Sequence, residues 1–248
     1  MATKTTSTGV AKITLQDLKL EAIMLRITGT SPLVTHPFPH KSMIEIAIKQ
    51  NDPPPKGAKK EYAIRKPYVE CLQSSYILSE LPPQFGSFQV DWEDPRSFSR
   101  NIEFTEAQWV EFAKNARFGF HVGGLKNALA DTAYDLKLIK KKDVIYGSVF
   151  FVNCEHDKIY GTPCVPIVNN APPIMRTDCL STFSSGADMR YRPQFDTWEM
   201  DLVLQFNPDI IDKKTLAQLL NYAGVMKGLG EYRAQKGGNW GGFKIKTD

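Results

Sequence analysis

The clearest pattern in the chain is a strict alternation of apolar and polar side chains over residues 198–206. Its apolar positions are Trp198, Met200, Leu202, Leu204 and Phe206, which is the period-two pattern of a strand with one buried face. The run at residues 18–27 is also strand-like, and its unbroken apolar stretch at 22–25 is typical of a central strand covered by helices. A shorter alternation follows at residues 243–246. These three runs predict strands.

Two other segments carry apolar side chains at helical spacing. In residues 118–136, glycines at 123 and 124 precede a stripe formed by Leu125, Ala128, Leu129, Thr132 and Leu136. Near the C-terminus, Asp212 stands at a capping position before a stripe formed by Leu216, Leu219, Leu220 and Ala223. The sequence therefore predicts two helices that each bury one face.

The order of these elements predicts an α+β fold. We also expect strand segments at 144–152 and 159–168, and a hairpin whose turn lies at 184–186. Residues 32–100 are rich in proline and charge without a period, so irregular structure is expected there. The series is a βαββαβ skeleton of the ferredoxin-like kind. We expect a flexible tail at 1–14 and a single domain at 15–248, with insertions at about 32–117 and about 141–197.

Composition limits the kinds of site. The chain is 42% hydrophobic and 23% charged, and no apolar run approaches the roughly 18 residues of a membrane span. Its first ten residues are small and polar, without the apolar region of a signal peptide. The four cysteines and four histidines form no metal-ligand pattern. We therefore expect a cytoplasmic protein with no metal, no cofactor and no membrane partner.

The stretch with the most distinctive chemistry is a glycine-rich loop at residues 228–242, between the second helix and the last strand. Successive backbone N–H groups in glycine-rich turns form concavities that bind anions, and aromatic faces stack on bases. The alternative is a turn that needs glycine only for its geometry. The candidate nucleic-acid-binding residues in this loop are Gly228, Gly230, Tyr232, Arg233, Lys236, Gly237, Gly238 and Trp240.

A second candidate anion site lies at the start of the first predicted helix. Gly123 and Gly124 would open this helix, whose N-terminus carries unpaired N–H groups, and Lys126 follows. The alternative is that these glycines only allow close packing of strand and helix. In a βαββαβ fold the first helix starts, and the second ends, at the same edge of the sheet. We therefore expect residues 123–126 to meet the loop at 228–242.

Positive charge gathers near these segments, although the net charge is only +4. From residue 213 to residue 246 the single acid is Glu231, against Lys213, Lys214, Lys227, Arg233, Lys236, Lys244 and Lys246. The predicted hairpin adds Arg176, Arg190 and Arg192. These arginines either bind phosphate or pair with Asp178 and Asp188 as an ordinary charged surface.

Two motifs resemble a known family. Residues 228–233 (GLGEYR) followed by 237–243 (GGNWGGF) resemble the glycine-rich loop of the repeat-associated mysterious proteins, the RAMP superfamily, and residues 124–129 (GLKNAL) resemble its helix start. The similarity extends to backbone subunits of CRISPR effector complexes and to related phage-encoded proteins. It implies a modified RNA-recognition-motif core that binds single-stranded nucleic acid, often as a row of subunits. Asn127 and Ala130 depart from the family's glycine and arginine, and residues 32–117 have no counterpart.

Three hypotheses for function follow. The first is a single-stranded nucleic-acid-binding protein, for RNA or DNA, that forms a homo-oligomer or filament along the strand, with CRISPR-type or phage subunits as further partners. The second is a metal-independent endoribonuclease, for which His36, His40 and His121 are the candidate acids and bases. The third is a protein-interaction module that mimics an effector subunit. A phage-encoded chain would act in the host cytoplasm.

Overall fold

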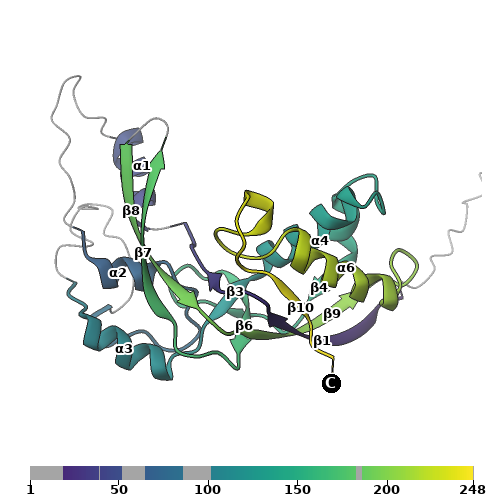
Figure 1. Cartoon of the computed structure of the whole chain (residues 1–248), viewed down its shortest axis with the longest axis horizontal. Coiled ribbons are helices and arrows are strands. Elements are labelled where there is room, and N and C mark those ends of the chain that lie inside the picture. The colour runs from purple at the N-terminus through teal and green to yellow at the C-terminus, as the bar shows by residue number, and fades with distance from the viewer. Residues whose placement is uncertain (1–18, 39, 52–64, 86–101, 183–185, 248) are drawn as a thin grey trace, which may run out of the picture.

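The computed structural model describes residues 19–38, 40–51, 65–85, 102–182 and 186–247 (Figure 1). It combines helices with antiparallel sheets, so the α+β prediction is confirmed. The tail predicted at 1–14 lies outside the described residues. Within the described residues, no helix is long and apolar enough to cross a membrane.

The main sheet is antiparallel, and the strand at 198–206 lies near its middle. Its order is β10 (Phe243–Ile245), β1 (Glu21–Gly29), β9 (Glu199–Phe206), β6 (Pro163–Val168) and β3 (Gly119–His121). β4 (Val149–Phe151) also pairs with β9, and β5 (Glu155–His156) pairs with β6. The period-two run at 198–206 thus forms a strand with neighbours on both sides.

Two helices cover one face of this sheet, as their apolar stripes predict (Figure 1). α4 (Val122–Asp135) and α6 (Lys213–Met226) bury their stripes, and Asp212 caps α6 by accepting the Thr215 N–H. The facing apolar residues of β9 are fully buried. Each buried leucine contributes roughly 1.5–3 kcal/mol, so this shared core is the main stabilising contact between helices and sheet.

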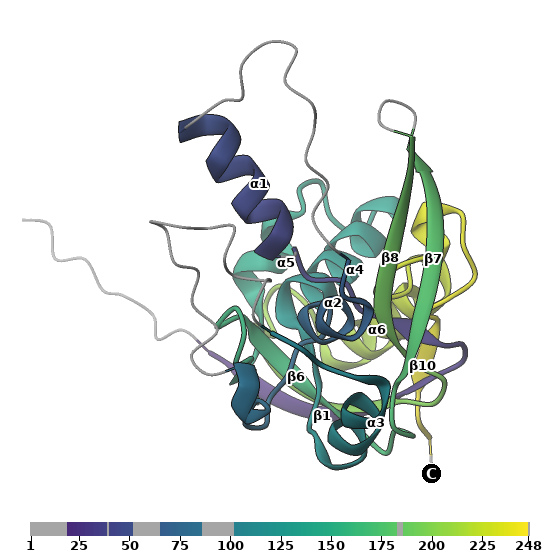
Figure 2. The same cartoon turned by 90° about the vertical axis from the view of Figure 1, so that its left-hand side faces the viewer.

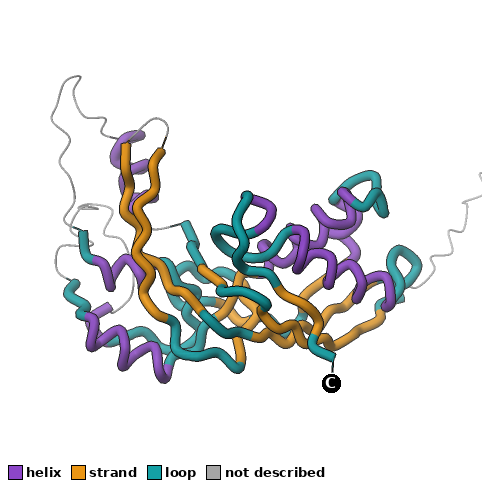
Figure 3. Tube along the Cα trace, viewed as in Figure 1, coloured by secondary structure: helices purple, strands orange, loops and turns teal. Residues whose placement is uncertain are grey.

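A second sheet holds the predicted hairpin. β7 (Ile174–Thr182) pairs along its length with β8 (Gly186–Phe195), and β2 (Leu33–Val34) lies on the other side of β8. Figure 3 shows this hairpin rising at one end of the main sheet, beyond the helices that cover it. α2 (Pro67–Gln73) packs against β8. The hairpin is therefore held by the short strand β2 and by α2.

The region expected to be irregular contains helices, so this expectation was wrong for its described part. α1 (His40–Asn51), α2 and η1 (Pro83–Phe85) lie within 32–100, and α3 (Glu106–Asn115) follows in the rest of the expected insertion at 32–117 (Figure 2). α3 begins with a capping box in which Thr105 and Gln108 satisfy each other's backbone N–H. Its apolar residues are few, and mainly Trp109 and Ala113 are buried, so the periodic signal is weak.

Two predicted strands are shorter than expected. Residues 143–148 form a helix, α5 (Asp143–Ser148), that packs on α4, so only the end of the run at 144–152 is a strand. In the run at 159–168 the strand begins at Pro163. Before it, the Asp157 carboxylate accepts the backbone N–H groups of Ile159, Tyr160 and Thr162. This side chain holds a turn where apolar composition alone predicts a strand.

Candidate nucleic-acid interface

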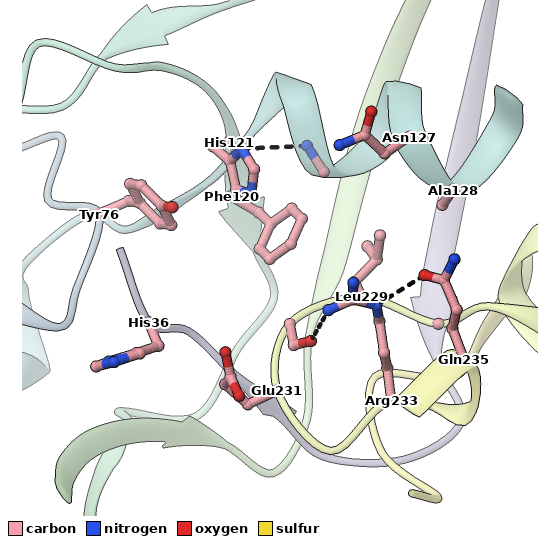
Figure 4. A pocket seen from close by; sticks show the side chains of 13 residues that line it. His36, Tyr76, Phe120, His121, Asn127, Ala128, Leu229, Glu231, Arg233 and Gln235 are labelled. Carbon is pink, nitrogen blue, oxygen red and sulfur yellow. Dashed lines mark hydrogen bonds between the residues drawn. The ribbon is translucent and has the colours of Figure 1, made fainter. Parts of the chain in front are cut away.

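The glycine-rich loop and the start of α4 meet around a pocket of about 150 Å³ (Figure 4). The predicted convergence of these two segments is therefore seen in the structure. Gln235 Nε2 donates to Asp131 Oδ2 at 2.6 Å, which joins the loop to α4. The pocket is lined by His36, Tyr76, Phe120, His121, Gly124, Asn127, Ala128, Gly228, Leu229, Gly230, Glu231, Arg233 and Gln235.

His121 caps α4 and forms part of the pocket wall. Its Nδ1 accepts the Gly124 N–H at 3.1 Å, and its ring lies 5.3 Å from the Tyr76 ring and 5.1 Å from the Phe120 ring. Burial, and then the charge of Arg233, lower the pKa of this imidazole. A Cβ at residue 124 would overlap the rings of Phe120 and His121, so this glycine allows the close packing of helix and strand.

His36 enters the pocket from the segment that follows β2. Burial, then Arg192 and Arg190, lower the pKa of His36 to about 4, although Asp188 acts in the opposite direction. His36 is therefore neutral at pH 7. Its buried Nδ1 has no hydrogen-bond partner among the described residues. His40 begins α1, but its side chain lies outside the described part of the chain.

Four lining residues with polar side chains were missed as site residues by sequence reasoning: Tyr76, Asn127, Glu231 and Gln235. Burial raises the pKa of the Tyr76 hydroxyl, with smaller contributions from Cys164, Asp157 and Glu231. Tyr76 lies in a loop without a period, so the sequence gives no signal for it. Glu231 carries one signal, because it is the only acid in residues 213–246.

The glycines of the loop serve the packing of the chain itself. Gly228, Gly230, Gly237 and Gly241 have positive φ. A Cβ at Gly230 would overlap the Val34 carbonyl oxygen, one at Gly238 that of Tyr232, and one at Gly241 that of Leu229. At these three positions glycine is required by the packing of the backbone, which is the alternative that the sequence left open. Gly237 differs, because a Cβ there would meet nothing within 4 Å.

Many N–H groups of the loop are also engaged within the chain, so they do not form the expected anion-binding concavity. The N–H groups of Leu229, Glu231 and Gly241 donate to the carbonyls of Gly241, Val34 and Pro32, at 2.8, 2.9 and 2.7 Å. The Trp240 N–H donates to the Tyr232 carbonyl at 3.0 Å. Binding at this loop must therefore rely on side chains.

The hairpin arginines hold the hairpin to the loop. Arg192 is 0% exposed, so its predicted contact with phosphate is corrected to a buried structural role. Its Nη2 donates to Asp178 Oδ2 at 2.6 Å and to the Tyr232 hydroxyl at 2.9 Å. Arg176 pairs with the same carboxylate and lies 4.2 Å above the Trp240 ring. The alternative pairing with aspartates is therefore observed, and at Asp178 it forms a buried junction.

The remaining predicted cations do not all lie at the pocket. Arg233 lines the pocket and donates from Nη1 to the Gly230 carbonyl at 2.8 Å. Lys236, at the end of η3 (Ala234–Lys236), is exposed. Arg190 pairs with Asp188 on the hairpin. Lys126 does not line the pocket, because its Nζ donates to the Tyr146 carbonyl on α5 and lies over the Phe150 ring.

Comparisons with known proteins identify no family. No family model matches the sequence, and no curated protein matches it. Among solved structures, the crystal structure of Cmr6 from Pyrococcus furiosus is similar, with 14% sequence identity and a TM-score of 0.34. The alignment covers 93% of this chain and 100% of that chain. An identity this low transfers no residue roles between the two proteins.

Proposed function

We propose that this protein binds single-stranded nucleic acid where the glycine-rich loop meets the start of α4. One observation carries the proposal. Two segments about a hundred residues apart meet at a pocket that combines Arg233 of the loop with the rings of Tyr76 and Phe120 from neighbouring segments, beside the exposed cation Lys236. Single-strand binding proteins combine these same two elements, cations that contact phosphates and rings that stack on bases.

The strand order supports a ferredoxin-like core of the RAMP kind. One βαβ unit consists of β1, α4 and β6, and the other consists of β9, α6 and β10. In the sheet, β9 lies between β1 and β6, and β1 lies between β9 and β10, so each unit is split by a strand of the other. The glycine-loop and helix-start motifs that resemble the RAMP superfamily are two of the segments that line the pocket. Fold and motif thus support the same family assignment from different observations.

The uncovered face of the main sheet is a poor alternative binding platform. On that face Arg26 pairs with Asp201, and Lys246 pairs with Glu199. Met24 lies opposite Val203 in the register of β1 and β9. RNA-recognition motifs stack bases on aromatic residues of such a face, whereas these positions carry aliphatic side chains and paired charges. We therefore place the strand on the loop side.

Assembly is also part of the proposal. We propose that several copies line up along one strand, and that CRISPR-type or phage-encoded subunits can join them. This part is supported by the sequence resemblance to RAMP backbone subunits. Sedimentation of the protein with strands of increasing length would test it, since a row predicts stepwise growth of the complex and a lone binder predicts a fixed mass.

The proposal is tested by fluorescence anisotropy with labelled single strands. We expect binding to single-stranded RNA or DNA of 20 nucleotides, and weaker binding to the matching duplex, whose bases are not accessible for stacking. Parallel RNA and DNA strands decide between the two nucleic acids. Absence of binding to both single strands would contradict the proposal.

A second candidate is metal-independent cleavage of RNA, because His36 and His121 line the same pocket as Tyr76. Their protonation argues against it. A general acid or base works best with a pKa near the working pH, whereas the pKa of His36 is lowered to about 4. The His121 lone pair at Nδ1 already accepts the Gly124 N–H. Cleavage of labelled RNA in the presence of EDTA, abolished by His36→Ala, would favour the enzyme.

A further inference from the structure

The wall of the pocket has almost no net charge at neutral pH, although it lies beside cations. Both imidazoles have a lowered pKa and are neutral, so they add no positive charge. The remaining charged groups of the lining are Arg233 and Glu231, which carry opposite charges. A phosphate inside the pocket would be repelled by the Glu231 carboxylate. A neutral, flat and polar group suits this wall better.

Several polar groups of the lining keep donor or acceptor atoms that form no hydrogen bond with the described residues. The Tyr76 hydroxyl points into the pocket in Figure 4 and has no hydrogen bond within the described residues. The Glu231 carboxylate accepts no hydrogen bond from any described residue, and its ion pair with Arg192 is long, at 3.6 Å. Asn127 Oδ1 accepts the Tyr146 hydroxyl, so the amide nitrogen of Asn127 keeps its donors for a ligand.

Of these groups only the Tyr76 side chain is buried, at 7% exposure, and a buried polar group without a partner costs about 1–3 kcal/mol. The Glu231 side chain is 37% exposed and Asn127 is exposed, so both are accessible to a ligand. These donors and this acceptor lie beside the rings of Tyr76, Phe120 and His121, which contact one another at tilted or T-shaped angles. Proteins recognise an unstacked base by stacking aromatic rings on its face and by forming hydrogen bonds with its edge.

We infer that the pocket takes one unstacked nucleobase that carries an exocyclic amino group, from the strand whose phosphates contact Lys236. This inference rests on the proposed function and adds a base preference to it. Glu231 would accept the amino hydrogens, as acidic side chains do from cytosine N4. Asn127 or Tyr76 would donate to the neighbouring acceptors of the ring. Uracil has a carbonyl where cytosine has the amino group, so its oxygen would face the Glu231 carboxylate.

Oligocytidine and oligouridine provide the direct test, because the two bases have the same ring and differ at this edge. We expect the full chain to bind a 12-nucleotide oligocytidine about tenfold more tightly than oligouridine in anisotropy titrations. Glu231→Gln should abolish or reverse this preference, because an amide presents donors to the uracil carbonyl. Asn127→Asp keeps the acceptor for Tyr146, removes the donors, and should also reduce binding of oligocytidine.

Lys236→Ala is the matched control, since loss of a phosphate contact should weaken both oligonucleotides by the same factor. Equal affinity of the parent for the two oligonucleotides would overturn the base pocket and leave strand binding intact. A preference that survives in both Glu231→Gln and Asn127→Asp, with unchanged melting temperatures, would also overturn it. If neither oligonucleotide binds, the proposed function and this inference are both wrong.

Discussion

Arg192 on β8 and Asp178 on β7 form an ion pair at 2.6 Å, and the arginine side chain is fully buried. The same guanidinium lies 5.0 Å from the centre of the Tyr232 ring and donates to its hydroxyl. Because Tyr232 belongs to the glycine-rich loop, this contact joins the hairpin to the loop. The position of the loop therefore depends on a charge within the hairpin.

The first prediction concerns this buried pair. Arg192→Ala should lower the free energy of unfolding by about 3–5 kcal/mol, because it leaves the Asp178 carboxylate without its main buried partner. Urea denaturation measures the change. Arg190→Ala, on the same strand and partly exposed, should cost no more than about 1 kcal/mol. Equal losses in the two variants would contradict a structural role specific to Arg192.

The second prediction separates two uses of glycine in the loop. Gly237 and Gly241 both have positive φ, but only at Gly241 would a Cβ overlap another backbone, at Leu229. Gly237→Ala should therefore cost about 1 kcal/mol, for backbone conformation alone, and Gly241→Ala clearly more. Thermal unfolding of the two variants gives the comparison. A larger loss at Gly237 would show that the loop is packed differently.

The third prediction concerns pH. The pKa of His36 in the folded protein is about 4, below its unfolded value of 6.5, so the unfolded state binds more protons between these values. Stability should therefore fall as the pH is lowered from about 6.5, by roughly 1 kcal/mol per pH unit at first. His36→Gln should have a shallower slope between pH 6.5 and pH 5 in urea denaturation. Parallel curves for parent and variant would refute the assignment.

The fourth prediction concerns salt. Binding through phosphates releases counterions, so the logarithm of affinity should fall by about 0.7 per decade of salt for each single-strand phosphate contact. Lys236→Ala should make this slope shallower by about one contact. Titrations between 50 and 500 mM salt measure it. An affinity that does not change with salt in the parent would exclude the phosphate contacts.

The sequence predicted those helices and strands in which apolar side chains recur at a regular spacing. The stripes of α4 and α6 and the alternation of β9 follow from the need to bury one face, and they place the two glycine segments at one edge of the sheet. The pocket could be located in this way, but its chemistry could not. Tyr76 and Glu231 come from loops, where no period shows which side chains face inward.

The arginines and glycines show a second limit of predicting site residues from the sequence. Charged side chains are mostly exposed, so a phosphate contact was a reasonable expectation for Arg192, and only the tertiary structure shows that the loop covers it. Glycine is required equally for the approach of a ligand and for the approach of another backbone. At Gly230, Gly238 and Gly241 the nearest backbone is that of the protein itself.

The most direct test of the central claim compares two reversals of charge that change the net charge of the protein equally. Lys236 lies beside the pocket, on η3, whereas Lys214 is exposed in the first turn of α6. In anisotropy titrations with one labelled single strand, Lys236→Glu should bind at least about tenfold more weakly than the parent, and Lys214→Glu less than about twofold more weakly. Equal effects of the two variants, or none from Lys236→Glu at an unchanged melting temperature, would contradict binding at the glycine-rich loop.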